Sequence, residues 1–259
     1  MKRFSALLAV FALASAKTMA QTTPCNAQSV WERMIEAKGG RSKLHSVDTL
    51  FVSGDYVWRN LLVTHRLQVR DLYRFPDFLW GWYNNGTAML GTSISHCYLD
   101  RGLCLVVLGP SQNPQVGRQP IDPSTSVLQE VSVLLLETRW RKPVLGACSE
   151  LGGAPTIEAI YNDLSYLFHL PKDATLPDRV DIVEPRGTTT YTLSGYERFD
   201  GVMLPTRHER AYGMRPPLVL KMKYEINPDY DRSLPNREPS LSEGPDSWRN
   251  PKTKPSRRR

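Results

Sequence analysis

Residues 218–226 read Leu-Val-Leu-Lys-Met-Lys-Tyr-Glu-Ile, and this stretch decides the fold class. Its large apolar side chains recur at every second position, and lysine or glutamate stands between them at 221, 223 and 225. A period of two is typical of a β-strand that has one buried and one solvated face. The chain is therefore expected to contain a sheet in which this strand is paired.

The same period recurs along most of the chain. The strand-like ranges are 50–58, 61–69, 78–83, 87–94, 103–108, 156–170, 179–185, 188–199, 202–212 and 217–226. Asn85-Gly86 and Asp200-Gly201 lie between such ranges and favour tight hairpin turns. Because loops of two to five residues cannot cross over to a parallel neighbour, we expect an antiparallel meander.

Two segments carry a helical period instead. Residues 26–38 place their apolar side chains on one helical face, and Gly39-Gly40 can end this helix in a left-handed conformation. Residues 126–141 start with a capping-box pattern and end before Pro143. The second helix either packs on the sheet as core or covers an apolar cavity, and the sequence leaves both interpretations open. Residues 109–125 contain four prolines and are expected to form a long surface loop.

Composition limits the class of protein. The 259 residues are 41% apolar and 23% charged, which is too polar for a multi-span membrane protein and too apolar for a disordered chain. The net charge of +7 comes from residues 1–20 and 240–259, and the body over 21–239 is formally neutral. A neutral body argues against nucleic acid as a partner.

The two ends have distinct patterns. Lys2 and Arg3 precede an apolar run, so residues 1–20 resemble a cleaved signal peptide; the run is shorter than the roughly 20 residues that span a bilayer. An uncleaved anchor is the alternative. Residues 240–259 are rich in Pro, Ser and basic side chains and are expected to be a disordered tail. That tail could also contact an anionic membrane surface. Between the two ends, 21–239 is expected to be one domain.

Four cysteines follow the leader, and four cysteines allow three pairings. Cys97 and Cys104 flank the turn signal Asp100-Arg101-Gly102, so they would lie opposite each other in a hairpin. This pairing leaves Cys25 with Cys148, and an exported chain is the setting in which disulfides persist.

Motifs for catalysis are missing from the sequence. The five histidines form no His-Glu-x-x-His, and neither Gly-x-Ser-x-Gly nor Cys-x-x-Cys occurs. We therefore expect a protein that is not an enzyme and has no metal or cofactor. A hydrolase whose residues converge from distant positions is the least favoured alternative.

Two regions resemble a known family. The stretch 31–54, Trp-Glu-Arg-Met-Ile-Glu-Ala-Lys-Gly-Gly-Arg-Ser-Lys-Leu-His-Ser-Val-Asp-Thr-Leu-Phe-Val-Ser-Gly, is similar to the first helix, Gly-Gly and first strand of the outer-membrane lipoprotein-sorting (carrier) family. Leu-Pro-Asp-Arg-Val at 176–180, Tyr-Glu-Arg-Phe-Asp-Gly-Val-Met-Leu-Pro at 196–205 and Tyr-Glu-Ile-Asn-Pro at 224–228 resemble its C-terminal strands. The four cysteines, the proline-rich loop and the basic end depart from that pattern.

The resemblance implies an incomplete antiparallel β-barrel, a strongly curved sheet covered by helices, in the bacterial periplasm. Alternating inward positions are then expected to line an apolar cavity. These positions are Val52, Tyr56, Leu67, Val69, Trp80, Trp82, Leu220, Met222 and Tyr224. The expected function is binding or carriage of lipid or of a lipoprotein's acyl chains. The alternative on the same scaffold is an envelope sensor or assembly factor that acts through protein contacts.

Overall fold

The computed structural model describes residues 25–59, 64–85, 92–98, 101–108, 115–120, 126–185, 187–212 and 217–252. These residues form a single sheet together with helices α1 (Ala27–Lys38), α2 (Arg41–His45), α3 (Ser126–Leu135) and the 3-10 helix η2 (Leu234–Asn236). The strands are β1 (Thr49–Arg59), β2 (Thr64–Arg74), β3 (Phe78–Asn85), β4 (Thr92–Tyr98), β5 (Leu103–Leu108), β6 (Gln115–Pro120), β7 (Val144–Leu151), β8 (Ala154–Tyr161), β9 (Leu164–His169), β10 (Arg179–Glu184), β11 (Gly187–Phe199), β12 (Val202–Tyr212) and β13 (Leu218–Ile226).

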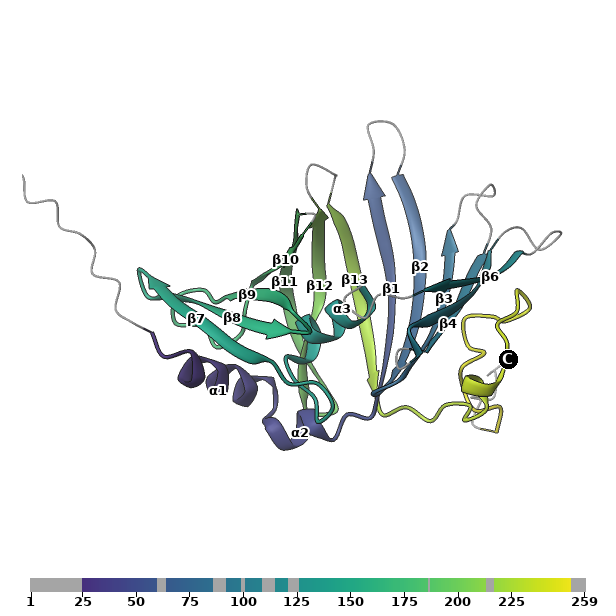
Figure 1. Ribbon diagram of the computed structural model, residues 1–259, viewed down its shortest axis with the longest axis horizontal. Helices are drawn as coiled ribbons and strands as arrows, with labels where there is room; N and C mark the ends of the chain where they lie inside the picture. Colours follow the sequence, from purple (N-terminus) through teal and green to yellow (C-terminus); the bar gives the residue numbers. More distant parts are fainter. Residues whose placement is uncertain are drawn as a thin grey trace, which may run out of the picture.

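The sheet is an antiparallel meander with one long-range pairing. Its strand order is β6-β5-β4-β3-β2-β1-β13-β12-β11-β10-β9-β8-β7, so β1 beside β13 joins the two ends of the domain. The sheet is strongly curved, α3 lies on its inner side, and β6 and β7 are its two edges (Figure 1). The predicted fold class, an incomplete antiparallel barrel with helices over it, is confirmed.

Helix α1 is held in place at both ends. The Asn26 side chain accepts a hydrogen bond from the Ser29 amide at 2.9 Å and caps the start. Gly39 ends the helix with φ 122°, and a Cβ there would lie 2.3 Å from the Gly201 carbonyl oxygen. This close approach to the β11–β12 turn explains why the chain needs glycine at 39. The buried Lys38 then joins α1 to α3, because its Nζ donates to the Leu134 carbonyl at 2.7 Å.

The two predicted disulfides are present. Cys97 and Cys104 are directly opposite in the β4–β5 ladder, as expected from the turn between them. Cys25 bonds to Cys148 on β7, which ties the start of α1 to one edge of the sheet.

The concave face of the sheet holds the larger of two apolar clusters. Helices α1 and α3 pack there against strands from both ends of the domain. The second cluster lies on the convex face of β1 to β5. Its buried members are Phe51, Leu72, Phe78, Trp80, Trp82, Ile94 and Tyr98 from the sheet, and Tyr230, Leu234 and Trp248 from the C-terminal segment.

The expectation that a solvated tail starts at residue 240 is wrong over 240–252. Trp248 is fully buried and stacks on Phe51 at 4.0 Å between ring centroids. Glu243 accepts a hydrogen bond from Trp80 Nε1 at 2.7 Å, and Arg249 pairs with Glu225. The polar, proline-rich composition of this segment did not predict that its tryptophan packs on apolar residues more than a hundred positions earlier in the chain. Residues 253–259 lie outside the described ranges, as does the expected signal peptide.

Four other features of the structure differ from the expectations. Within the predicted loop 109–125, residues 115–120 form β6, which pairs with β5 despite Pro120 because it is an edge strand. The range 156–170 is a hairpin, β8 and β9, and not one strand. Strand β7 precedes it and was not predicted, since its sequence has a glycine and little alternation. Helix α3 ends at 135, because Leu136 adopts φ 63° and its carbonyl accepts from the Tyr161 hydroxyl.

Among the helices that the structure describes, none has the length and apolar character needed to cross a membrane.

We predict that Trp248→Ala lowers the free energy of unfolding by about 3–5 kcal/mol, because truncating a buried tryptophan removes its packing and leaves a cavity. The matched control is Trp140→Ala. Trp140 is 51% exposed, so its loss should cost less than about 0.5 kcal/mol. Urea unfolding monitored by circular dichroism measures both. Equal stability of Trp248→Ala and wild type would show that the C-terminal segment contributes nothing to the fold.

Candidate functional site

Seven of the nine predicted cavity residues share the concave face. The β1–β13 register pairs Val52 with Tyr224 and Tyr56 with Leu220, and Met222 falls between them opposite Gly54. The β1–β2 register adds Val69 and Leu67 to the same face. Five of these seven side chains are buried; Tyr56 and Leu67 are half-buried.

Trp80 and Trp82 do not belong to this face. The β2–β3 register places Gly81 and Tyr83 opposite the concave positions Asp71 and Val69, so the two tryptophans point to the convex side. There they pack under the C-terminal segment. A shift of one residue moves a whole strand's pattern to the opposite face, and on β3 both faces are apolar, so alternation alone misassigned it.

A polar cluster that the sequence analysis did not predict lies on the concave face. Asp71 of β2 is buried and accepts a hydrogen bond from the Tyr83 hydroxyl at 2.7 Å. Glu130 of α3 is buried as well, and the Tyr73 hydroxyl lowers the pKa of its carboxyl. Gly81 makes room for Tyr83, because a Cβ at 81 would lie 2.8 Å from the Tyr83 ring.

Burial sets the ionisation of this cluster. Removal from water, together with the smaller effect of the neighbouring Glu130, raises the pKa of Asp71 to about 8. Burial likewise raises the pKa of Glu130 to about 7, against the attraction of Arg210. At neutral pH the Asp71 carboxyl is therefore mainly protonated. The sequence contained one indication of this site, because Asp71 is an aspartate at an inward position of its strand, where the preceding inward residues are apolar.

A cleft of about 600 Å³ opens between β12 and β13. The two strands pair from Arg207 opposite Lys221 to Arg210 opposite Leu218 and separate beyond that point. Pro205 lies two positions beyond the last paired residue, Arg207, and has no amide hydrogen to donate to β13. Its carbonyl instead accepts a hydrogen bond from the Tyr224 hydroxyl at 2.7 Å.

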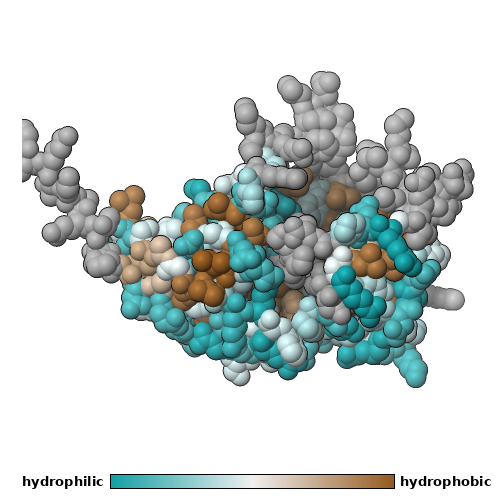
Figure 2. Space-filling model, in the orientation of Figure 1, coloured by the Kyte–Doolittle hydropathy of each residue, from teal (hydrophilic) through white to brown (hydrophobic). Residues whose placement is uncertain are grey.

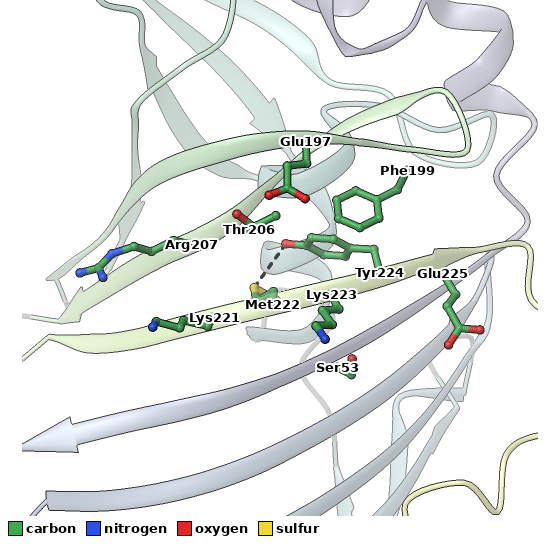
Figure 3. A pocket seen from close by; sticks show the side chains of 10 residues that line it. All are labelled: Ser53, Glu197, Phe199, Thr206, Arg207, Lys221, Met222, Lys223, Tyr224 and Glu225. Carbon is green, nitrogen blue, oxygen red and sulfur yellow. Dashed lines mark hydrogen bonds between the residues drawn. The ribbon is translucent and has the colours of Figure 1, made fainter. Parts of the chain in front are cut away.

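The cleft has an apolar floor and a charged rim (Figure 3). Met222 and Tyr224 reach it from the concave face, and Phe199 packs edge-on against Tyr224 with ring centroids 5.1 Å apart. Glu197, Arg207, Lys221, Lys223 and Glu225 surround this floor. Two predicted cavity residues therefore also border an opening in the sheet.

Three histidines in the described residues contact structural partners. His169 Nε2 lies 3.0 Å from Asp181, His45 Nε2 lies 2.9 Å from Glu137, and His96 Nδ1 lies 3.1 Å from the Arg237 carbonyl. No group of three metal-ligating side chains occurs in the described parts of the chain.

Solved structures share this architecture. A DUF1329 family protein from Desulfovibrio piger matches with a TM-score of 0.52 and 11% identity, over 80% of this chain and 95% of its own. A domain from Vibrio parahaemolyticus, described as an outer membrane lipoprotein-sorting protein, matches with a TM-score of 0.51 and 12% identity, over 80% of this chain and 96% of its own.

At these identities the likeness concerns the fold. The chain has the lipoprotein-sorting type of fold, which confirms the resemblance inferred from its sequence. No protein-family model matches the sequence, and no curated protein matches it.

We predict that Asp71→Asn raises the melting temperature at pH 8 by several degrees and has little effect at pH 4. The folded-state pKa of Asp71 is above its unfolded value, so stability is full below about pH 4 and declines as the pH rises toward 8. Each unit of such a shift corresponds to about 1.4 kcal/mol. Asparagine keeps an oxygen that can accept a hydrogen bond from the Tyr83 hydroxyl, and its side chain cannot ionise.

Thermal melts between pH 4 and pH 8 measure this effect. Asp55→Asn, at an exposed position of the neighbouring strand, serves as the control and should follow wild type. If wild type and Asp71→Asn have parallel melting profiles over this range, Asp71 is ionised in the folded protein.

Proposed function

We propose that the protein is an exported lipid-binding or carrier protein of the cell envelope that holds acyl chains against the concave face of its sheet and catalyses no reaction. The observation that carries this proposal is the concave face. One curved sheet turns Val52, Leu220 and Met222 toward α3 and not toward a second sheet. Burying one methylene is worth about 0.8 kcal/mol, so a partly enclosed chain binds without a charged partner.

Export and periplasmic residence belong to the same proposal. Two disulfides in a chain with a signal-like N-terminus are typical of an oxidising compartment. The fold supports the lipid ligand only by similarity, because the Vibrio parahaemolyticus domain is described as lipoprotein-sorting.

A second candidate function, a sensor or assembly factor that acts by protein contact, is favoured by one surface. Leu151 and Val144 on the edge strand β7 are 76% and 70% exposed, and Trp140, which precedes this strand in the chain, is 51% exposed. Figure 2 shows hydrophobic residues at the surface over β7 and β8. An apolar edge strand is a common site for pairing with another chain.

The lipid proposal predicts that mature protein purified from the periplasm co-purifies with lipid in native mass spectrometry and binds a fluorescent fatty acid saturably. Met222→Glu should weaken that binding by tenfold or more, because it puts a carboxylate among buried apolar side chains. Ser194→Glu places the same group at an exposed position of β11 and should bind as wild type does.

Circular dichroism checks the fold of each variant. Tyr56→Glu, at a half-buried position of the same face, replaces Met222→Glu if that variant does not fold. Failure of wild type to bind any acyl probe would contradict the lipid proposal and favour the protein-contact candidate.

A further inference from the structure

One buried polar atom on β11 and another on β12, both on the concave face, have no hydrogen-bond partner among the described residues. They are the Tyr191 hydroxyl on β11 and Nδ1 of His208 on β12, and the two side chains are 1% and 0% exposed. Their rings stack with centroids 6.0 Å apart. An unsatisfied polar group costs free energy in a protein interior, so such groups point to a missing partner.

Arg210 lies beside these atoms on the same face. It is opposite Tyr191 in the β11–β12 ladder, and its guanidinium carbon is 5.5 Å from the centre of the Tyr191 ring. In the described part of the chain its contacts are this ring and charge interactions with Glu130 and Glu184, and no hydrogen bond or ion pair of the guanidinium is among them. Toward the described residues, the guanidinium of this half-buried arginine thus has donors that make no hydrogen bond.

The acceptors around Arg210 are already engaged. Glu130 Oε1 lies 3.8 Å from His208 Nε2, and the Tyr73 hydroxyl lowers the pKa of the Glu130 carboxyl. Glu184 accepts from Gln129 Nε2 at 2.6 Å. Burial also raises the pKa of Glu130 to about 7, which reduces its negative charge near neutral pH. Among the described residues, the Tyr191 hydroxyl and the Arg210 guanidinium thus keep donors to which a further acceptor can bind.

We propose that Arg210, Tyr191 and His208 bind the carboxylate of a single-chain fatty acid, whose chain extends along the concave face past Leu220 and Met222. This inference rests on the proposed lipid-binding function and names its ligand class. Arginine recognises a carboxylate through paired charge-assisted hydrogen bonds, and the Tyr191 hydroxyl supplies a further donor. Leu220 pairs with His208 across β12 and β13, so the apolar path starts directly beside the polar site.

The test compares ligands that share one chain: oleate, methyl oleate and oleyl phosphate, titrated by intrinsic tryptophan fluorescence. We expect wild type to bind oleate at least tenfold more tightly than methyl oleate, which corresponds to about 1.4 kcal/mol. Arg210→Met keeps the aliphatic stem and should abolish this preference while methyl oleate binds as before. Arg198→Met removes an exposed arginine on β11 and should retain the preference.

Tyr191→Phe provides a variant that should fold at least as well as wild type, because it removes a buried hydroxyl without a partner. We expect it to lose affinity for oleate and not for methyl oleate. Equal binding of oleate and methyl oleate by wild type, or an undiminished preference in Arg210→Met, would overturn the carboxylate site while the lipid-binding function stands. Tighter binding of oleyl phosphate than of oleate would also overturn it. Binding of none of the three lipids would instead contradict the proposed function itself.

Discussion

A single sheet with apolar side chains on both faces cannot bury either face by itself, and this constraint governs the rest of the structure. Curvature and the helices α1 and α3 enclose the concave face. The convex face of β1 to β5 depends on the C-terminal segment, where Trp248 stacks on Phe51. The long-range pairing of β1 with β13 brings that segment to the strands it covers, because β13 ends directly before it. Segments near both ends of the described residues thus contribute to covering one sheet.

The strand pattern of this fold could be read from the sequence where one face is polar. β13 alternates between apolar and charged side chains, so its inward residues Leu220, Met222 and Tyr224 were assigned to the correct face. β3 has large apolar residues on both faces, and there the register with β2 decides, which no local pattern contains. The cover over Trp80 and Trp82 was also hidden, because it comes from residues beyond 226 whose composition is that of a solvated chain.

The candidate site likewise combines residues that the sequence predicted with residues that it did not. The apolar concave positions follow from period two, whereas the polar cluster of Asp71, Glu130 and Tyr83 arises from three separate elements. Each of these residues is unremarkable in its own segment, and only the curvature brings α3 over β2. Buried carboxyls cost stability unless they are protonated or paired. A fold that keeps two of them in its interior departs from apolar packing at the place where a binding function is proposed.

The concave face is not uniform along the sheet, and this limits where a ligand can lie. Over β8 to β10 its inward side chains, such as Ile157, Phe168 and Ile182, are fully buried, and α1 packs on β7, β8 and β12. That part is filled by the protein's own core. Over β1, β2, β12 and β13 one inward residue, Tyr56, is half-buried. The Tyr191 hydroxyl and His208 Nδ1, on the adjoining β11 and β12, have no hydrogen-bond partner among the described residues, and an opening lies beside Pro205. The half-buried Tyr56, the two unpartnered atoms and the opening thus lie on neighbouring strands, and a ligand there could supply hydrogen bonds that the described residues do not make.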